Sequence, residues 1–175
     1  MPARCRPATP RSESRRRSST LGRMAVSIRH AQPADYGRII QHVNAWWGGR
    51  EMAPMLPKLF FVHFEGTSFV AEDGGGELVG FLVGFQSQTD PSEAYVHFVG
   101  VSPGQRGSGL GRELYDRFAA AAKEHGCTTV RCVTSPANEA SVAFHTKIGF
   151  EIDRVAPDYD GPGEDRVLLV RRLGS

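Results

Sequence analysis

The sequence predicts a mixed α/β domain in which strands and helices follow the order β-α-α-β-β-β-α-β-α-β-β. Two patterns carry this prediction. Short runs rich in β-branched and aromatic residues, bounded by glycine, proline or aspartate, predict strands. Apolar residues spaced three and four positions apart predict amphipathic helices between them. A chain of 175 residues is most often one domain, and it is long enough to bury a sizeable core.

The first half of the chain contains three predicted strands and two predicted helices. Residues 25–31 alternate polar and apolar side chains, which is typical of a strand. Pro33 stands in the first turn of the helix that follows, a favoured position for proline. A stripe of apolar residues indicates this helix: Tyr36, Ile39, Ile40 and Val43. A second, short helix is predicted within 55–66, and the runs 67–73 and 77–88, joined by three glycines, predict a β-hairpin.

The second half of the chain alternates strands with two helices. A run rich in β-branched and aromatic residues predicts a strand at 94–101. After a glycine-rich stretch, a helix is predicted from about Leu110 to a C-terminal cap at Gly126. The remaining predicted elements are a strand at 128–134, a helix at 138–149, and strands at 150–156 and 165–173. No internal repeat is present.

The charge of the chain is unevenly distributed. Residues 1–24 carry seven arginines and one acidic residue, Glu13, which gives +6; because the whole chain carries +2, residues 25–175 carry −4. The basic segment has too few apolar residues to order itself, so we expect a disordered tail followed by a single domain over 25–175. The tail lacks the apolar stretch of a secretory signal. It could be a transit peptide, a nucleic-acid-binding arm, or sequence preceding a native start at Met24.

Composition argues against several functional classes for the folded part. No run reaches the roughly 18 apolar residues of a membrane span, and a domain charge of −4 suggests no nucleic-acid partner. The three cysteines, Cys5, Cys127 and Cys132, form no CxxC pair, which fits a reduced cytoplasmic protein. The six histidines show no HxH or HExxH spacing, so we expect no metal site.

Glycines are concentrated in the stretch VGVSPGQRGSGLGREL, residues 99–114, between a predicted strand and a predicted helix. The first N–H groups of a helix lack intrahelical acceptors, and the helix dipole favours negative charge there. Glycines allow a phosphate to approach several of these N–H groups. The guanidinium of Arg106 adds further donors and a permanent positive charge. The stretch therefore predicts a phosphate or pyrophosphate site.

Other interpretations of this stretch fit less well. A Walker loop requires Gly-Lys-Ser/Thr, whereas Gly111 is followed by Arg112 and Glu113. A dinucleotide fingerprint requires GxGxxG after a parallel βαβ opening, whereas Gly107, Gly109 and Gly111 give GxGxG. A plain glycine turn from strand to helix, without a ligand, is the alternative that these residues alone leave open.

Two motifs resemble those of the GCN5-related N-acetyltransferase (GNAT) superfamily. Arg106-x-x-Gly109-x-Gly111 resembles its acyl-CoA signature, R/Q-x-x-G-x-G/A. NEASVAFHTKIGF, residues 138–150, resembles the later segment that closes its cofactor cleft, and the order of elements over 25–171 is similar to that fold. The resemblance implies an acyl-CoA N-acyltransferase fold, with a central twisted mixed sheet of about six or seven strands flanked by about four helices.

The resemblance also implies where acetyl-CoA would bind. Its pyrophosphate would lie on the glycine-rich loop, and its pantetheine arm in a V-shaped gap where strand 94–101 separates from strand 128–134. We expect Gly100 to ease a bulge, and an N–H group between Val99 and Val101 to polarise the thioester carbonyl. The residues assigned to the cofactor are Val99, Val101, Gln105, Arg106, Gly107, Ser108, Gly109, Leu110, Gly111, Asn138 and Ser141.

The predicted helix 138–149 has a polar and an apolar face. The polar face, expected to line the cleft, contains Asn138, Ser141 and His145. The apolar face, expected to pack in the core, contains Ala140, Phe144 and Ile148. Asn138 has the side chain of an N-cap, and the resemblance adds a contact with the pantetheine arm; the two roles are compatible.

His145 is the candidate acid. The superfamily usually has a tyrosine at this place, which protonates the departing thiolate. A histidine cation can donate a proton near neutral pH, but burial lowers the pKa of histidine and favours a hydrogen-bonding role. Ser141 is a weaker candidate, and a histidine packed beside the cofactor without chemical consequence is the alternative.

His97 and Glu93 are the candidate bases, because an amine must lose a proton before it attacks a thioester. Both belong to the region of strand 94–101, where strict alternation would place Glu93, His97 and Val99 on one face. His97 is nearer the expected carbonyl site. The alternative is a histidine that is simply hydrogen-bonded on a half-buried strand.

The acceptor amine is expected to contact the segment between the first strand and the hairpin. Trp46, Trp47 and Arg50 lie there in an irregular stretch, where variable binding surfaces are common. The tryptophans could instead form core and lid. The acidic residues of 153–166 could attract a cationic amine or simply be solvated.

These features together predict a cytoplasmic acetyl-CoA-dependent N-acetyltransferase that acts on a primary amine by direct attack in a ternary complex. No cysteine occupies a motif position that would favour an acyl-enzyme. The alternative is a non-catalytic acyl-CoA-binding or regulatory domain. Small amines, amino acids, antibiotics, polyamines, peptide N-termini and protein lysines all stay open as acceptors. The resemblance also allows a homodimer; no nucleic-acid or membrane partner is expected.

Overall fold

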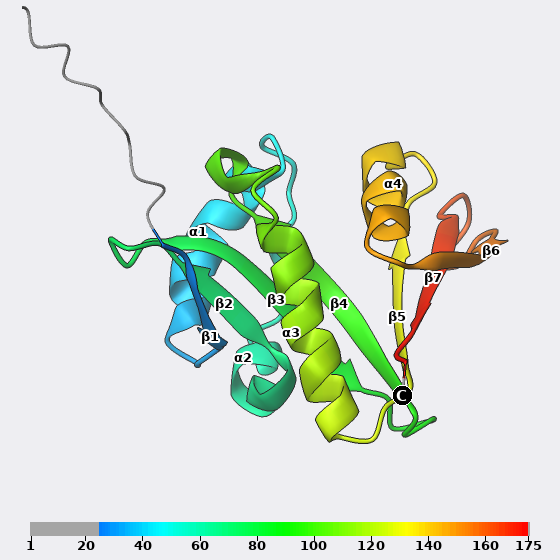
Figure 1. Ribbon diagram of the computed structural model, residues 1–175. Coiled ribbons are helices and arrows are strands. Elements are labelled where there is room, and N and C mark those ends of the chain that lie inside the picture. Colours follow the sequence, from blue (N-terminus) through cyan, green and yellow to red (C-terminus); the bar gives the residue numbers. More distant parts are fainter. Residues whose placement is uncertain (1–24, 175) are drawn as a thin grey trace, which may run out of the picture.

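Seven strands form one sheet in the computed structural model, which describes residues 25–174, and their order is β1-β2-β3-β4-β5-β7-β6 (Figure 1). The strands are β1 (Ser27–His30), β2 (Phe69–Glu72), β3 (Leu78–Gln86), β4 (Glu93–Val101), β5 (Thr129–Thr134), β6 (Glu151–Ala156) and β7 (Arg166–Arg172). The predicted α/β class and the predicted strands are confirmed. The tail predicted over 1–24 lies outside the described residues.

The helices flank this sheet on both faces. They are α1 (Asp35–Trp46), α2 (Leu59–His63), α3 (Leu110–Glu124) and α4 (Glu139–Lys147). In Figure 1, α3 crosses one face of the sheet, while α1 and α2 lie behind it. The predicted apolar stripe of α1 is confirmed, since Ile39 and Val43 are fully buried.

Each face of the sheet has its own apolar core. On the α3 face, Leu114 and Phe118 are fully buried. On the opposite face, residues of α1 pack with the fully buried Phe61 of α2. Complete burial of one such side chain contributes roughly 1.5–3 kcal/mol. Because β3 and β4 are covered on both faces, they form a rigid support for the loop that follows β4.

The strands β4 and β5 are the one parallel pair among the described residues. They pair over only three residue positions, the last of which is Tyr95 opposite Arg131. Beyond this position, β4 continues to Val101 and β5 continues to Thr134, but the two strands no longer pair with each other. Figure 1 shows them separating. The predicted V-shaped gap between these strands is confirmed.

A bulge interrupts β4 at His97. Val96 and Phe98 lie opposite consecutive residues of β3, so His97 between them is the extra residue. The bulge reverses the alternation of side chains. Val99 packs against the core beneath α3, whereas the ring of His97 stacks on Phe60 of α2 with centroids 4.6 Å apart. Strict alternation, which would have placed His97 and Val99 on one face, is therefore interrupted, and the two side chains lie on opposite faces.

Gly100 has a different role from the predicted one. It pairs in register with Phe81 of β3, so the predicted bulge at this residue is wrong. A Cβ atom at this position would lie 2.5 Å from Cε1 of Phe81 and 2.8 Å from Cη2 of Trp47. The absence of a side chain at Gly100 therefore makes room for two aromatic rings against β4.

Candidate functional site

The glycine-rich loop connects the end of β4 to the first turn of α3. Pro103–Gln105 form a 3-10 turn, and Gly107 and Gly109 have φ angles of +75° and +95°, which other residues rarely adopt. The carbonyl of Gly109 accepts the N–H of Glu113 at 3.1 Å and so begins the helix. The earlier N–H groups of α3 have no intrahelical acceptor. The loop therefore presents donors to an anion, as its sequence predicts.

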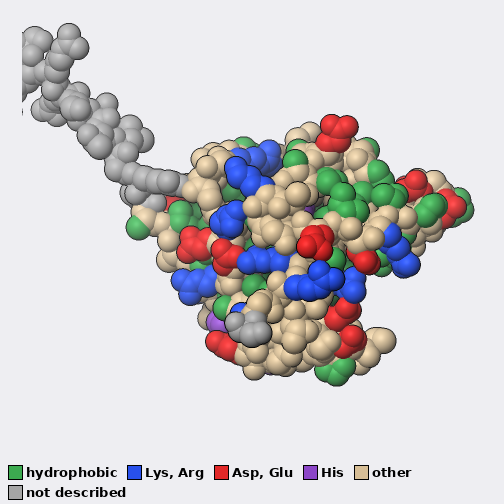
Figure 2. All heavy atoms as spheres, turned by 45° about the vertical axis from the view of Figure 1, so that its right-hand side comes forward, with side chains coloured by type: hydrophobic (Ala, Val, Ile, Leu, Met, Phe, Trp, Pro, Cys, Tyr) green, Lys and Arg blue, Asp and Glu red, His purple; other side chains and the backbone are tan. Residues whose placement is uncertain are grey.

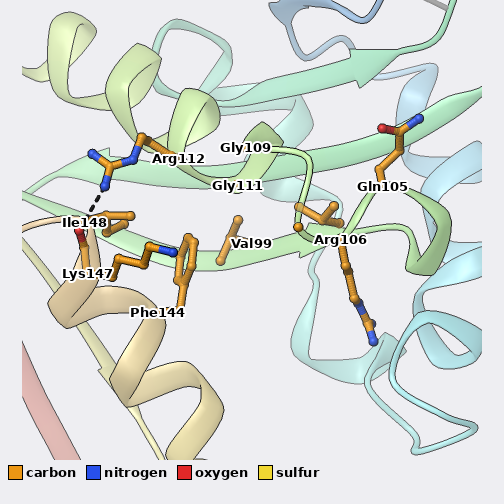
Figure 3. Close-up of a pocket in the computed structure, with 11 residues that line it drawn as sticks. Val99, Gln105, Arg106, Gly109, Gly111, Arg112, Phe144, Lys147 and Ile148 are labelled. Carbon is orange, nitrogen blue, oxygen red and sulfur yellow. Dashed lines mark hydrogen bonds between the residues drawn. The ribbon is translucent and has the colours of Figure 1, made fainter. Parts of the chain in front are cut away.

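A cavity of about 410 Å³ lies beside this loop, between β4, α3 and α4 (Figure 3). It is lined by Val99, Val101, Gln105, Arg106, Gly107, Gly109, Gly111, Arg112, Phe144, Lys147 and Ile148. Two predicted cofactor residues of the loop, Ser108 and Leu110, lie outside this lining. The side chain of Leu110 is buried in the core, and the hydroxyl of Ser108 accepts the N–H of Leu110 at 3.3 Å.

The wall that α4 contributes is largely apolar. Phe144 and Ile148 line the cavity, although the sequence assigns them to the core face of this helix. Ala140, assigned to the same core face, is exposed. Ile148 is nevertheless buried in the core beneath α3 and Phe144 packs against that core, so the predicted core face is confirmed for these two residues, and α4 approaches α3 so closely that both also cover the cavity. The prediction that the polar face of α4 lines the cleft is wrong, because His145 is buried and the other two polar residues lie outside the lining. Gly111 permits this approach, since a Cβ atom there would lie 3.1 Å from Cζ of Phe144.

Two basic residues of the lining were missed by sequence reasoning. Arg112 donates a hydrogen bond from Nη2 to the carbonyl of Lys147 at 2.9 Å, which joins the first turn of α3 to the end of α4 (Figure 3). Both residues bring positive charge to the cavity, which favours a ligand that carries phosphates. The position of Arg112 directly after the glycines could have indicated its place at the site. Nothing in the sequence indicated Lys147, because its position at the cavity depends on the packing of α4.

The backbone of β4 supplies a second set of donors. The N–H of Ser102 donates to the carbonyl of Val79 on β3 at 2.9 Å. Successive N–H groups of a strand point alternately to its two sides, so those of Val101 and Val99 point toward β5. Because the β4–β5 ladder has already ended, these N–H groups face the gap. They lie beside the cavity that the same two residues line.

Arg106 extends its side chain away from the cavity, as Figure 3 shows. Its Nη2 donates a short hydrogen bond to the carbonyl of Trp46 in the last turn of α1. Carbonyl groups at the end of a helix lack intrahelical donors, and a cation interacts favourably with the helix dipole there. The guanidinium thus connects the loop to α1, while the backbone of Arg106 helps to form the loop.

His145 lies behind the α4 wall, with 5% of its surface exposed. Its Nδ1 lies 2.7 Å from the carbonyl of Ser141, so this nitrogen carries the proton and donates. Its Nε2 then accepts a hydrogen bond from the hydroxyl of Tyr115 on α3, at 2.7 Å. Both ring nitrogens are therefore engaged within the protein, and the histidine connects α4 to α3.

Burial also determines the ionisation of these groups. It lowers the pKa of His145 below its usual 6.5, an effect that the hydrogen bond to the Ser141 carbonyl opposes. It raises the pKa of Tyr115 well above 10, and raises that of the neighbouring Cys132 thiol to about 12. All three groups are uncharged at neutral pH.

Asn138 and Ser141 lie at the start of α4. The side chain of Asn138 accepts the N–H of Ser141 at 3.2 Å, so the predicted N-cap is confirmed. The hydroxyl of Ser141 lies 3.3 Å from Nδ1 of His145. Neither residue belongs to the cavity lining formed by the described residues. In the structure, both contribute to the local folding of α4.

The two predicted bases have different surroundings. His97 is exposed, and its Nε2 lies 2.8 Å from the carbonyl of Met55. Nε2 therefore carries the proton, and Nδ1 is left with a free lone pair. Glu93 instead forms an ion pair with Arg131 of β5, with Oε1 and Nε 2.5 Å apart.

The predicted acceptor residues lie in a segment that crosses β4 opposite α3; we refer to residues 46–55 as the acceptor segment. Trp46 is 7% exposed, and Trp47 stacks on Phe98 of β4 with ring centroids 5.0 Å apart. Arg50 is exposed. The side chain of Asn44 connects this segment to α1 by accepting the N–H of Met52 and the next N–H, at 2.8 and 2.9 Å.

Two features are absent from residues 25–174. No group of three or more His, Cys, Asp or Glu side chains there is arranged to hold a metal ion. Within the same range, no helix has the length and apolar character needed to cross a membrane.

Comparison with known proteins agrees with this geometry. A profile of the Acetyltransferase (GNAT) family matches residues 31–150. An L-2,4-diaminobutyric acid acetyltransferase of Nocardia farcinica is 36% identical over 85 residues, which are 49% of this chain and 44% of that protein. The chain therefore spans less than half the length of this relative.

Two further comparisons cover more of both chains. An L-methionine sulfoximine/L-methionine sulfone acetyltransferase of Pseudomonas aeruginosa is 30% identical over 152 residues, 77% of this chain and 85% of that one. The crystal structure of Ard1 from Thermoplasma volcanium superposes with a TM-score of 0.71 at 25% identity, covering 86% of this chain and 99% of that one. The family profile matches well over half of the chain, and the chain belongs to the GNAT family of acetyltransferases.

Proposed function

We propose that this protein is an acetyl-CoA-dependent N-acetyltransferase, with residues 25–175 as its single catalytic domain. The observation that carries the proposal is the end of the β4–β5 ladder beside the glycine-rich loop. It leaves unpaired strand N–H groups next to an anion-binding helix start, which suits a ligand with a polar arm and a pyrophosphate. Family membership and the names of the relatives support the same activity.

The described residues fit acetyl-CoA, which supplies the acetyl group as a thioester when bound. Within the loop, the N–H groups of Gly107, Gly109 and Gly111 would hold the pyrophosphate. The other N–H groups between 105 and 110 donate hydrogen bonds inside the loop and so fix its shape. The N–H groups of Val99 and Val101 would bind the pantetheine arm, and one of them would donate to the thioester oxygen, where negative charge develops during attack. The ring of Phe144 would cover the arm and exclude water. No step in this proposal requires a metal.

His97 is our proposed base. With its Nε2–H donated to the Met55 carbonyl, its Nδ1 can accept a proton from the acceptor amine, directly or through a water. The amine would then attack the thioester carbonyl by direct displacement in a ternary complex. Glu93 is the weaker candidate, because its carboxylate is already paired with the guanidinium of Arg131.

His145 and Ser141 have a different proposed role on the thiol side. In the tautomer described above, His145 has no free N–H to offer to a departing sulfur. We assign it to holding α4, and with it Phe144, at the correct distance from α3. Asn138 and Ser141 would support this by stabilising the first turn of α4.

The acceptor is proposed to be a primary amine on a small molecule or a peptide, bound at Trp46, Trp47 and Arg50. The relatives named above carry names of free amino acids or their analogues. A homodimer is supported by β6, a strand at the sheet edge whose Ile152 and Val155 are 52% and 54% exposed. Figure 2 shows apolar side chains among basic and acidic ones on this side of the molecule. The free thiols of Cys127 and Cys132 support a cytoplasmic location.

Calorimetric titration of the full chain with acetyl-CoA, with ATP and NAD as controls, tests the cofactor. An amine panel that includes L-2,4-diaminobutyrate, methionine sulfoximine and short peptides, followed by thiol release and product mass, tests the transfer. His97→Gln should lower kcat by about 100-fold without changing the affinity for acetyl-CoA.

The matched control is His63→Gln, which replaces an exposed histidine of α2 and should leave kcat unchanged. Selective binding of ATP or NAD would contradict the cofactor assignment. Binding of acetyl-CoA without turnover of any amine would favour a non-catalytic acyl-CoA-binding domain.

A further inference from the structure

The contact between Arg106 and Trp46 joins two parts of the site that are 60 residues apart in sequence. One end is the loop proposed to hold the pyrophosphate. The other is the last turn of α1, from which the acceptor segment begins. This hydrogen bond involves a guanidinium, which makes it roughly twice as strong as a bond between neutral groups. A shift of the loop would therefore act directly on the end of α1.

The acceptor segment is in turn held against β4 by its own contacts. Trp47 stacks on Phe98 and occupies the space that a side chain at Gly100 would need. Farther along the segment, the carbonyl of Met55 accepts a hydrogen bond from His97, the proposed base. The chain of contacts thus leads from the cofactor loop through Arg106 and the tryptophans to the base.

We propose that Arg106 is a positioning residue that couples the cofactor loop to the acceptor segment, so that acetyl-CoA binding prepares the site for the amine. The inference rests on the proposed function, since it takes acetyl-CoA as the ligand of the loop. Coupling between two binding sites is reciprocal. The acceptor amine therefore binds more tightly to the acetyl-CoA complex than to the free protein.

The two tryptophans of the whole sequence are Trp46 and Trp47, so tryptophan fluorescence, excited at a wavelength that tyrosine does not absorb, reports on the start of the acceptor segment. In the full-length protein, we expect saturating acetyl-CoA to change this fluorescence. Arg106→Met keeps the length of the side chain but removes its donors. It should remove most of the fluorescence change, while calorimetry shows an acetyl-CoA affinity within about threefold of the wild type, well below the tenfold loss that about 1.4 kcal/mol would cause.

Arg112→Met is the matched control. Arg112 also lines the cavity, but its hydrogen bond goes to Lys147 on α4 and not to α1. This variant should keep the fluorescence amplitude at saturation, whatever its affinity. Arg106→Lys restores one donor and should recover part of the amplitude, which separates loss of the contact from a general loss of folding.

The outcomes that overturn the coupling are distinct. If Arg106→Met loses affinity more than about tenfold but keeps the full amplitude at saturation, the guanidinium is a phosphate ligand and does not couple the two parts. If it keeps both affinity and amplitude, the contact has no influence. If the wild type binds acetyl-CoA in the calorimeter without any fluorescence change, the coupling alone fails. If the folded wild type does not bind acetyl-CoA, the proposed function fails as well.

Discussion

Gly111 illustrates how a single residue determines the width of the cofactor cavity. It lies in the first turn of α3, where glycine costs roughly 0.5–1 kcal/mol relative to alanine. The compensating feature is space, because Phe144 of α4 approaches within contact distance of the position a Cβ would take. Glycine at this position therefore allows α4 to approach α3 closely, although it lowers the intrinsic stability of α3.

Gly111→Leu should weaken acetyl-CoA binding at least about tenfold, or about 1.4 kcal/mol, because the added side chain enters the cavity or displaces Phe144. Calorimetric titration measures this effect. Gly37→Leu is the control, since Gly37 also lies in a helix, α1, and a Cβ there meets nothing within 4 Å. Equal affinities of the two variants would contradict the assignment of this cavity to acetyl-CoA.

At the scale of secondary-structure elements, the packing of α4 against α3 determines the shape of the cavity. Sheet pairing does not hold α4 in place, and the gap it covers is the cavity itself. The hydrogen bonds from Tyr115 to His145 and from His145 to the Ser141 carbonyl lie in the buried interface of the two helices. In this apolar environment, a polar group that lost its hydrogen-bond partner would lower the free energy of unfolding.

Tyr115→Phe and His145→Phe should each reduce the free energy of unfolding by about 1–3 kcal/mol. The double variant should lose clearly less than the sum, because removing both partners leaves fewer unpaired groups. Urea unfolding of the four proteins measures this cycle. The control pair, Tyr36→Phe with His63→Phe, takes two residues of the other face of the sheet. Additive losses for the Tyr115 and His145 variants would show that the bond does not connect the helices.

For the whole molecule, two buried ionisable groups make stability depend on pH in separate ranges. Because burial lowers the pKa of His145, the unfolded chain binds a proton first as the pH falls below about 6.5, and the folded state loses stability. Burial alone would raise the pKa of Asp35, but hydrogen bonds from Arg29 and the N–H of Gln32 lower it below 3.8. The stabilisation that ionised Asp35 gives to the folded state is therefore present above about pH 4 and is lost below it.

The free energy of unfolding should therefore decrease in two steps, each with a slope of at most about 1.4 kcal/mol per pH unit for one proton. His145→Phe should remove the step below about pH 6.5 and leave the one below about pH 4. Asp35→Asn should weaken only the lower step. Urea unfolding across this pH range measures both. A His63→Phe control should keep both steps, and an unchanged upper step in His145→Phe would contradict the assignment.

The secondary-structure elements and the glycine-rich loop could be predicted from the sequence without the structure. The strands, the four helices and the glycine-rich turn before Leu110 follow from spacing along the chain. Alternation, helical periodicity and the φ freedom of Gly107 and Gly109 are local properties that need no knowledge of distant partners. The N-cap at Asn138 is local in the same sense.

The contacts between these elements around the cavity could not be predicted from the sequence, because they depend on the three-dimensional packing. This packing placed the bulge at His97 instead of Gly100, turned the apolar side of α4 toward the cavity, and directed Arg106 to the Trp46 carbonyl. Each outcome depends on which distant segment packs opposite a residue. A guanidinium and an unpaired helix carbonyl 60 residues away can pair only after the cores on both faces of the sheet have brought α1 and the loop together.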